Sequence, residues 1–241
     1  IIGQICTAAL TVYYLFRTKS FRLAKTSLRP AAGLLKNILP LGVLSFLTQI
    51  SIVIVMGVMN NVMVTYGAQS KYGSDIPLTV VGIVMKVFQI VISIVVGIAA
   101  GAQPVIGYNY GAGLNGRVRD IYKKMMVAVL CIGGVAMLAF ELFPLQIISI
   151  FGSEEGLYNE FAVLCFRIYL STIVLCSAVK ASGIFLQALG KPVHSMGLSL
   201  LREFVLCVPL ILLLPTRFGL MGVLYSAPIA DVISVVAAVI L

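Results

Sequence analysis

Residues 97–113 read Gly97-Ile-Ala-Ala-Gly-Ala-Gln-Pro-Val-Ile-Gly-Tyr-Asn-Tyr-Gly-Ala-Gly113, and they interrupt an otherwise almost wholly apolar chain. Gly97 and Gly101 stand four residues apart, a spacing that lets a neighbouring helix approach closely. Proline lacks a backbone donor and disfavours the α conformation in the residue before it, so Gln103-Pro104 predicts the end of a helix. The glycines and tyrosines that follow are typical of a turn at a membrane surface.

The composition predicts a membrane protein. Of the 241 residues, 61% are hydrophobic and only 10% are charged, whereas soluble domains carry about 25% charged residues. The formal net charge of +9 would suggest a nucleic-acid partner in a soluble protein. Here the basic residues fall in loops, so we expect membrane lipid as the partner and no nucleic acid. The five cysteines show no metal-ligand spacing, and we expect no metal or cofactor.

The apolar runs predict an all-α polytopic fold, because each is long enough for a helix to cross a bilayer. Residues 1–16 are too short for a complete span, so we interpret them as the remnant of a preceding helix and the chain as a fragment. Residues 17–37 form a basic connector, and residues 38–241 a lobe of six transmembrane helices. We place these six spans at residues 38–66, 78–103, 125–150, 161–187, 193–214 and 218–241.

The distribution of basic residues predicts the orientation. Residues 17–36, residues 114–124 and Lys191 together carry eleven basic residues, whereas the opposite loops carry only Lys71 and Arg217. Cytoplasmic loops are enriched in lysine and arginine. We therefore expect residues 17–37 and 104–124 to be cytoplasmic, in a multi-pass protein of the plasma (inner) membrane.

Three strings carry a family resemblance. They are Gly101-Ala-Gln-Pro-Val-Ile-Gly-Tyr-Asn-Tyr-Gly-Ala112 (the first motif), Ala181-Ser-Gly-Ile-Phe-Leu-Gln-Ala-Leu-Gly-Lys-Pro192 (the second) and Ala227-Pro-Ile-Ala-Asp231 (the third). In this order they resemble sequences of the multidrug and toxic compound extrusion (MATE) family, after its eighth helix, at the end of its tenth and in its last helix. The matching positions are Gly101, Gln103, Pro104, Gly107, Tyr108, Asn109, Tyr110, Gly111, Gln187 and Gly190.

The resemblance implies the carboxy-terminal lobe of a twelve-helix, two-lobe transporter, with the amino-terminal lobe as its partner. It also implies an antiporter that exports organic cations or other xenobiotics in exchange for H+ or Na+, by alternating access to a cavity near the midplane. Catalytic arrangements are not evident, so we do not expect an enzyme. A flippase for lipid-linked saccharides, which needs a cationic cavity, and a non-transporting membrane scaffold are the alternatives.

Polar residues inside the spans are the candidates for the substrate or ion pathway, because charges there are costly unless they are paired or wet. The candidates are Gln49, Lys86, Lys180, Glu203 and Asp231. Gln49 lies in the helix where some branches of the family carry an ion-binding carboxylate, and Lys180 stands in another acid-free span, which departs from a sodium-binding pattern.

The two acidic candidates leave two interpretations open. Glu203 and Asp231 either take part in ion coupling or are neutralised in structural pairs with basic residues. Neighbouring residues on an α-helix point in different directions, so we expect Arg202 and Glu203 to face different partners and not each other. For Asp231 we expect a position in the lobe interior and a pair with Arg202 or Lys180.

Overall fold

The computed structural model describes residues 2–17, 32–152 and 156–240, and its contacts divide the chain into two units, residues 1–42 and 43–241. The first unit contains α1 (Ile2–Arg17) and the beginning of α2 (Ala32–Ala68). Most of the expected connector, residues 18–31, lies outside the described residues. Its last part, residues 32–37, is already helical.

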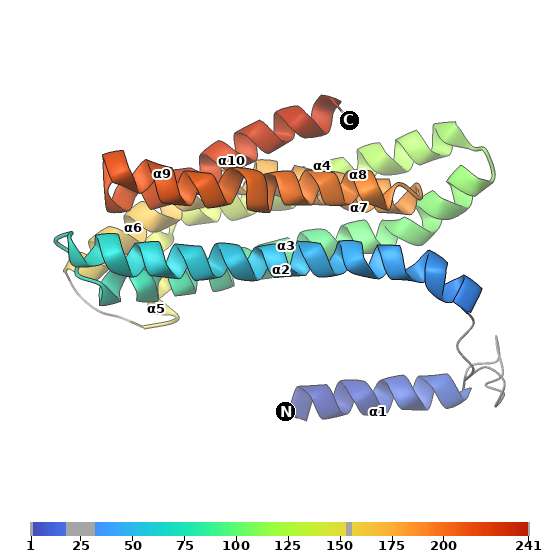
Figure 1. The fold of residues 1–241 in the computed structure, drawn as a ribbon, viewed down its shortest axis with the longest axis horizontal. Coiled ribbons are helices and arrows are strands. Elements are labelled where there is room, and N and C mark those ends of the chain that lie inside the picture. Colours follow the sequence, from blue (N-terminus) through green and yellow to red (C-terminus); the bar gives the residue numbers. More distant parts are fainter. Residues whose placement is uncertain (1, 18–31, 153–155, 241) are drawn as a thin grey trace. The chain divides into compact units, whose positions relative to one another are not determined.

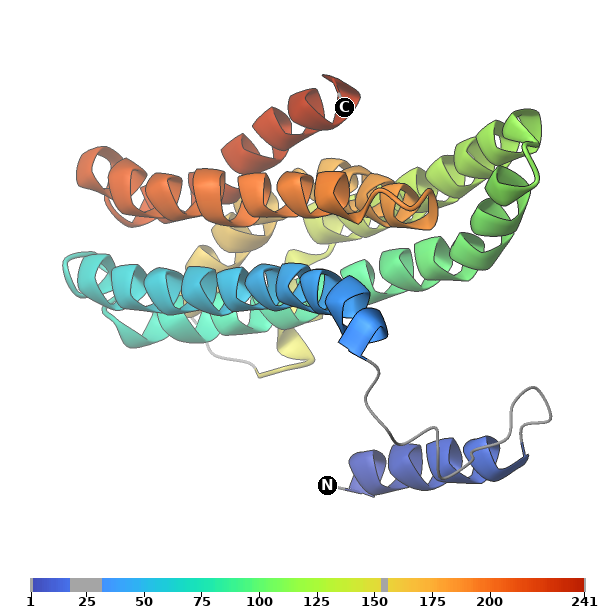
Figure 2. The same cartoon turned by 45° about the vertical axis from the view of Figure 1, so that its right-hand side comes forward.

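The second unit is a bundle of long helices (Figures 1 and 2). The end of α2 is followed by α3 (Asp75–Gly111), α4 (Asn115–Leu142), α5 (Pro144–Ser149), α6 (Leu157–Tyr169), α7 (Ile173–Ala188), α8 (Pro192–Leu200), the π-helix η2 (Leu201–Cys207), α9 (Val208–Phe218) and α10 (Leu220–Ile240). Helix α7 packs against both α3 and α4, and α10 packs against α9. The described residues of this unit contain no strand.

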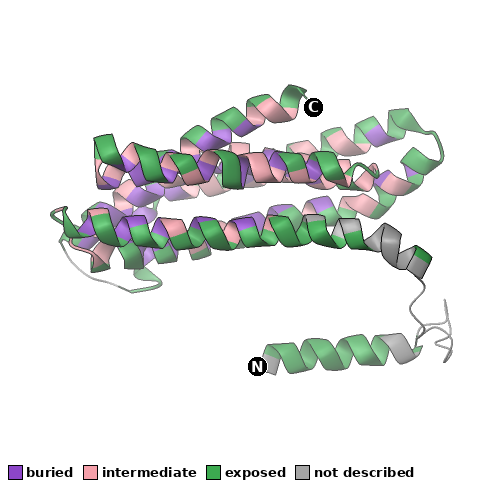
Figure 3. Ribbon diagram, in the orientation of Figure 1, coloured by how far each residue is buried: buried purple, intermediate pink, exposed green. Residues whose placement is uncertain are grey.

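The all-α polytopic fold is confirmed. Among the described residues, five helical segments are long and apolar enough to cross a membrane, and α6 with α7, bent by 46° at their junction, makes a sixth. The uninterrupted segment from Pro192 to Phe218 joins α8, η2 and α9 into one span. Large apolar side chains remain exposed on the outer surface, as expected of helices that face lipid (Figure 3).

The first motif is helical, contrary to the expected boundary at Gln103-Pro104. Helix α3 continues to Gly111 with Pro104 inside it, and the turn comes only at Gly113, where φ is +73°. The residues after the proline are held by packing and hydrogen bonding: Ile106 is fully buried, and Asn109 Nδ2 donates to the Val105 carbonyl at 2.8 Å. These contacts offset the one backbone hydrogen bond that proline removes.

The basic segment 114–124, expected as a loop, is also helical. Helix α4 begins at Asn115, so the basic residues occupy its first turns. Val118 and Met125, seven residues apart, are both buried, and they form the apolar stripe of an amphipathic helix. The expected third span is interrupted at its carboxy-terminal end, where α4 stops at Leu142 and Pro144 begins α5.

The close approach expected at Gly97 and Gly101 is not made within this unit. A Cβ atom at either position would meet no described atom within 4 Å. A glycine that does allow two helices to pack closely is Gly133 of α4, where a Cβ atom would lie 3.1 Å from the Val174 Cα atom of α7.

The turn between α2 and α3 is hydrogen-bonded to α6. Lys71 Nζ donates to Glu160 Oε1 at 2.7 Å, and the Tyr72 hydroxyl donates to the same oxygen at 3.0 Å. The hydrogen bond to the Glu160 carboxylate raises the pKa of the Lys71 amine. Beneath this pair, the rings of Tyr72 and Phe161 pack with their centroids 5.0 Å apart.

Candidate functional site

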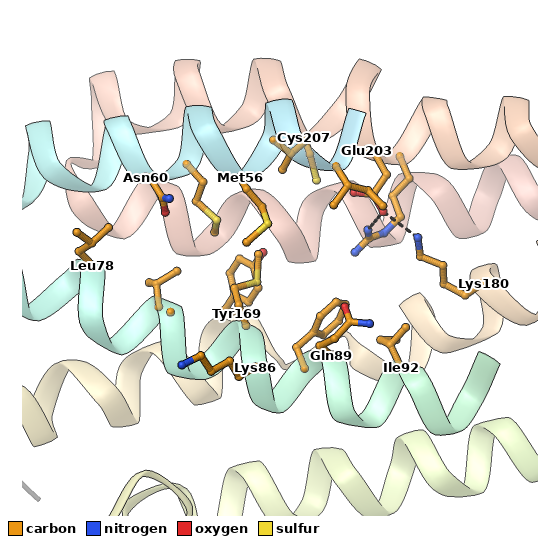
Figure 4. A pocket seen from close by; sticks show the side chains of 18 residues that line it. Met56, Asn60, Leu78, Lys86, Gln89, Ile92, Tyr169, Lys180, Glu203 and Cys207 are labelled. Carbon is orange, nitrogen blue, oxygen red and sulfur yellow. Dashed lines mark hydrogen bonds and ion pairs between the residues drawn. The ribbon is translucent and has the colours of Figure 1, made fainter. Parts of the chain in front are cut away.

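A cavity of about 620 Å³ lies inside the second unit (Figure 4). Helices α2 and α3 line it together with Tyr169 of α6, Lys180 of α7 and the π-helix η2. Most of the lining is apolar, including Met56, Met59, Met85, Phe88 and Ile92. Its charged lining residues are Lys86, Lys180, Arg202 and Glu203.

Four charged residues form a connected group, the ionic quartet of Lys180, Arg202, Glu203 and Asp231. Glu203 Oε1 accepts from Lys180 Nζ and from an Arg202 Nη atom, each at 2.9 Å. The Arg202 Nε atom donates to Asp231 Oδ1 at 2.7 Å. The quartet thus joins α7, η2 and α10, three elements that are distant in sequence.

The quartet is neutral and largely shielded from solvent. It contains two basic and two acidic side chains, and the Asp231 and Arg202 side chains are only 4% and 8% exposed. The second carboxylate oxygen of Asp231 accepts from the Thr172 hydroxyl at 2.7 Å. Since both Asp231 oxygens have donors, its buried charge is compensated. The expected pairing of Asp231 with Arg202 in the lobe interior is present.

The expectation that Arg202 and Glu203 do not face each other is wrong. They do have different outside partners, Asp231 and Lys180, but an Arg202 Nη atom also donates to Glu203 Oε1. The expectation assumed an α-helix, whereas these residues lie in η2, whose i→i+5 hydrogen bonds place more residues in each turn. Adjacent side chains are therefore less divergent, and the long arginine side chain closes the remaining gap.

Thr172 was missed by sequence reasoning. It lies at the junction of α6 and α7, where residues 170–172 interrupt the helix and the Ser171 hydroxyl donates to the Ile168 carbonyl at 2.8 Å. This break turns Thr172 toward Asp231. Neither proline nor glycine marks the position; the adjacent Ser171-Thr172 pair was the available signal, because such hydroxyls compete for helix carbonyls.

Lys86 of α3 lines the same cavity but does not join the quartet. Figure 4 shows its amine apart from the Lys180–Glu203 pair. The residue is exposed, and the described part of the chain gives its amine no hydrogen bond and no ion pair. Among the described charged residues that line the cavity, Lys86 is the one whose charge has no acidic partner.

Gln49 is separate from the other candidates. It is exposed on α2 and does not line the cavity. Two other polar residues that the sequence analysis had not selected, Asn60 and Gln89, do line it. The structure therefore brings together Lys180, Glu203 and Asp231, places Lys86 across the same cavity, and leaves Gln49 outside.

The first two motifs meet at one end of the bundle, where α3 packs against α7. Gln103 Nε2 donates to the Ile184 carbonyl at 3.4 Å, and a Cβ atom at Gly107 would lie 3.6 Å from the Ala188 oxygen. Gln187 Nε2 donates to the Ser195 hydroxyl at 2.9 Å, which links α7 to α8. These motif residues join helices, whereas Asp231 of the third motif belongs to the quartet.

A bundle of membrane-crossing helices around a partly charged cavity is the architecture of a polytopic membrane transporter lobe. The profile of the MatE family matches residues 45–213 of this chain, which is more than half of its length. The chain belongs to the MatE family, and it is a multi-pass membrane protein.

Curated relatives agree with this assignment. The multidrug export protein MepA of Staphylococcus aureus (strain N315) is 22% identical over 241 residues, which are 100% of this chain and 51% of MepA. The MepA protein of Staphylococcus saprophyticus is 23% identical over the same coverage. The chain spans about half the length of the curated relatives it matches.

Solved structures show the same fold. An outward-facing multidrug resistance MATE transporter superposes with a TM-score of 0.82 at 20% identity, over 99% of this chain and 53% of that one. A MATE transporter in complex with MaL6 superposes with a TM-score of 0.85 at 21% identity, over 99% of this chain and 53% of that one. A transporter of the MOP superfamily from Pyrococcus furiosus, described by a binding pocket of reverse polarity, gives 0.84 at 20% identity, again covering 99% and 53%.

Proposed function

We propose that this chain forms one lobe of a multidrug efflux antiporter, which exports amphipathic small molecules in exchange for H+ or Na+. The cavity of about 620 Å³ carries the proposal, because its volume lies in the range of roughly 300–1,000 Å³ typical of sites for drug-sized ligands. An apolar wall with a few polar groups suits amphipathic molecules of varied shape. The relatives are multidrug export proteins and not enzymes, which supports transport over catalysis.

A second lobe completes the transporter in this proposal. The matched relatives are about twice as long as this chain, so they have room for a second set of helices. Two lobes that rock about a cavity near the midplane expose it alternately to each side of the membrane. Organic cations, the class that the family resemblance implies, would need their countercharge from that second lobe, because both carboxylates near this cavity wall have basic partners.

The ionic quartet supports a structural role for Asp231 and Glu203. Ion coupling requires a carboxylate that can exchange its proton or bind a cation during transport. Asp231 is engaged by Arg202 and Thr172, and Glu203 by Lys180 and Arg202. We therefore place the coupling carboxylate in the second lobe, and we assign Asp231 and Glu203 to holding α7, η2 and α10 together.

The alternative of a lipid-linked saccharide flippase is less favoured by this geometry. A pyrophosphate carries several negative charges and would call for several free cations. Lys180 and Arg202 are already engaged by acidic residues, so Lys86 is the one uncompensated cation that the described residues place on this wall. A non-transporting scaffold is separated by the transport measurement below, since it predicts that the folded protein exports no dye.

Transport in proteoliposomes tests the proposal. The longest chain that the gene encodes should export ethidium against its gradient when a proton or sodium gradient is imposed, and it should not flip a fluorescently labelled lipid-linked saccharide. Residues 1–241 expressed alone should not transport, because one cavity wall cannot alternate. Lipid flipping without dye export would overturn the proposal, as would transport by residues 1–241 when cross-linking shows a monomer.

We also propose that the turn between α3 and α4 is cytoplasmic, as the bias of basic residues predicts. Asn115 is exposed at the start of α4, and Gln69 is exposed at the start of the α2–α3 connection, at the opposite end of α3. In a background with Cys6 and Cys131 replaced, a membrane-impermeant thiol reagent should label Gln69→Cys on intact cells and leave Asn115→Cys unlabelled. The reverse pattern would invert the orientation.

A further inference from the structure

The charges around the cavity do not balance. Among the described residues, three basic side chains and one acidic side chain line it. Asp231, behind Arg202, supplies a second negative charge, and the quartet then contains two charges of each sign. The positive charge of Lys86 is left over on the cavity wall.

Lys86 lies within the membrane span. It follows Leu78, where the apolar run of α3 begins, by eight residues, which is about 12 Å along a helix that rises 1.5 Å per residue. The hydrocarbon core is about 30 Å thick, so the Lys86 backbone is nearer its middle than its edge. An ammonium group at such a depth needs water or a countercharge.

The described acidic residues of the second unit do not provide that countercharge. Glu203 and Asp231 belong to the quartet. Glu160 pairs with Lys71, and Glu141 pairs with Arg167 at 3.7 Å. The remaining two are Asp75, at the end of α3, and Asp120, near the beginning of α4. Neither lines the cavity.

The surface around Lys86 is suited to a flat apolar body. Met85 and Phe88 stand beside it on α3, and Met56, Met59 and Tyr169 line the cavity with them. Methionine side chains adapt to ligands of different shape and make favourable contacts with aromatic rings. A ligand with an aromatic or aliphatic body and one acid group would satisfy both the apolar lining and the lysine.

We infer that the cavity takes amphipathic organic anions and that Lys86 binds their carboxylate, sulfonate or phosphate group. The inference rests on the proposed transport function and specifies its substrate class. Lys180 and Arg202 do not bind the anion, because the quartet already engages them. The Lys86 amine binds one acid group of such a molecule, and the apolar side chains hold the rest of it.

Two dyes with the same ring system test the inference. Carboxyfluorescein is an anion and rhodamine 123 is a cation, and both are built on a xanthene. Transport of each is measured in proteoliposomes that contain the longest chain encoded by the gene. The variants are Lys86→Gln, Lys86→Arg, Lys86→Glu and, as a matched control, Lys191→Gln, which removes the same charge from an exposed residue of the α7–α8 turn.

The wild-type protein should export carboxyfluorescein with a higher kcat/KM than rhodamine 123. Lys86→Gln should raise the KM for carboxyfluorescein about tenfold, as expected for loss of a charge-assisted hydrogen bond. Lys86→Arg should keep most of the carboxyfluorescein export, and Lys86→Glu should reverse the preference, so that rhodamine 123 is exported with the higher kcat/KM. Lys191→Gln should change the transport of neither dye. Thermal unfolding of each variant identifies losses caused by misfolding, and the Arg variant keeps the test valid if Gln destabilises the protein.

The outcomes separate the inference from the proposed function. Export of rhodamine 123 in preference to carboxyfluorescein, unchanged by Lys86→Gln, would overturn the inference and leave the transporter in place. Failure of the reconstituted wild-type protein to export either dye or ethidium would overturn both.

Discussion

The ionic quartet and Lys86 are two answers to the same physical problem, a charge inside an apolar bundle. In the quartet every charge has a partner within the lobe, and three of its side chains are at most 10% exposed. Lys86 lines the same cavity and has no acidic partner among the described residues. A charge that is neutralised within the fold stabilises the fold, whereas one left open to a cavity is available to a ligand.

The largest expected effect is the loss of Arg202, the centre of the quartet. Arg202→Leu leaves two buried carboxylates without their shared partner, and removing one member of a buried ion pair costs about 3–5 kcal/mol. We expect a large fall in the thermal unfolding temperature in detergent, or no folded protein. Lys191→Gln is the control for loss of a basic residue. An unfolding temperature equal to that of the wild type would show that the quartet does not stabilise the bundle.

Asp231→Asn should have a smaller effect, because the amide oxygen can still accept from Arg202 or Thr172. We expect a loss of roughly 2–3 kcal/mol, since the charge that balances Arg202 is removed. The surviving protein should keep its pH-dependent efflux if the residue is structural. Loss of ion-driven efflux at normal protein levels would assign coupling to Asp231. A fully stable and fully active Asp231→Leu variant would contradict both roles.

Thr172→Val should lower the free energy of unfolding by less than Asp231→Asn does. Valine keeps the volume of threonine but removes the donor that holds Asp231 Oδ2 at 2.7 Å. A hydrogen bond to a charged group contributes about 1.5 kcal/mol or somewhat more. The loss should disappear when Asp231 is already replaced by leucine, which a double-mutant cycle by thermal unfolding can measure. Equal losses in both backgrounds would show that Thr172 acts independently of Asp231.

The smallest effect is expected at the exposed pair of Lys71 and Glu160. Their side chains are 59% and 49% exposed, so water and salt screen the attraction. Lys71→Met should leave the unfolding temperature within experimental error at 0.15 M salt. Because the hydrogen bond to Glu160 raises the pKa of the Lys71 amine, any stabilisation is complete below the ordinary pKa of 10.5 and is lost as pH rises above it. A marked fall in the unfolding temperature of Lys71→Met at neutral pH would show that this exposed pair stabilises the bundle.

Hydropathy alone predicts most of the helical architecture. Long apolar runs can satisfy their backbone in lipid only as helices, so the positions of the six spans follow from the sequence. The ends of helices are predicted less well. Pro104 predicted the end of a helix, but α3 continues past it because Ile106 and Asn109 are buried there. The basic residues after Leu114 predicted a loop, although Val118 and Met125 among them form the apolar stripe of α4.

The site is only partly predictable, because its geometry depends on local departures from the α-helix. Burying a charge in a membrane span is costly, and this cost predicted correctly that Asp231 has a basic partner. The contact between Arg202 and Glu203 depends on the π-helix, and the approach of Thr172 depends on the bend between α6 and α7. The bend has no proline or glycine at its position, whereas Pro209, two residues after η2, is a local signal for the π-helix, because it removes the backbone hydrogen bond to the Val205 carbonyl. The roles of Gln49, Lys86, Lys180, Glu203 and Asp231 in transport stay predictions.

A paired measurement on Lys86→Gln and Asp231→Asn tests the division between structural and ligand-binding charges most directly. Both variants are purified from the longest chain that the gene encodes, and thermal unfolding and carboxyfluorescein export per folded molecule are measured for each. The account predicts that Lys86→Gln keeps its unfolding temperature and loses export, whereas Asp231→Asn loses stability and keeps export. The opposite pattern, a destabilised Lys86 variant that transports normally beside a stable Asp231 variant that does not, would contradict it.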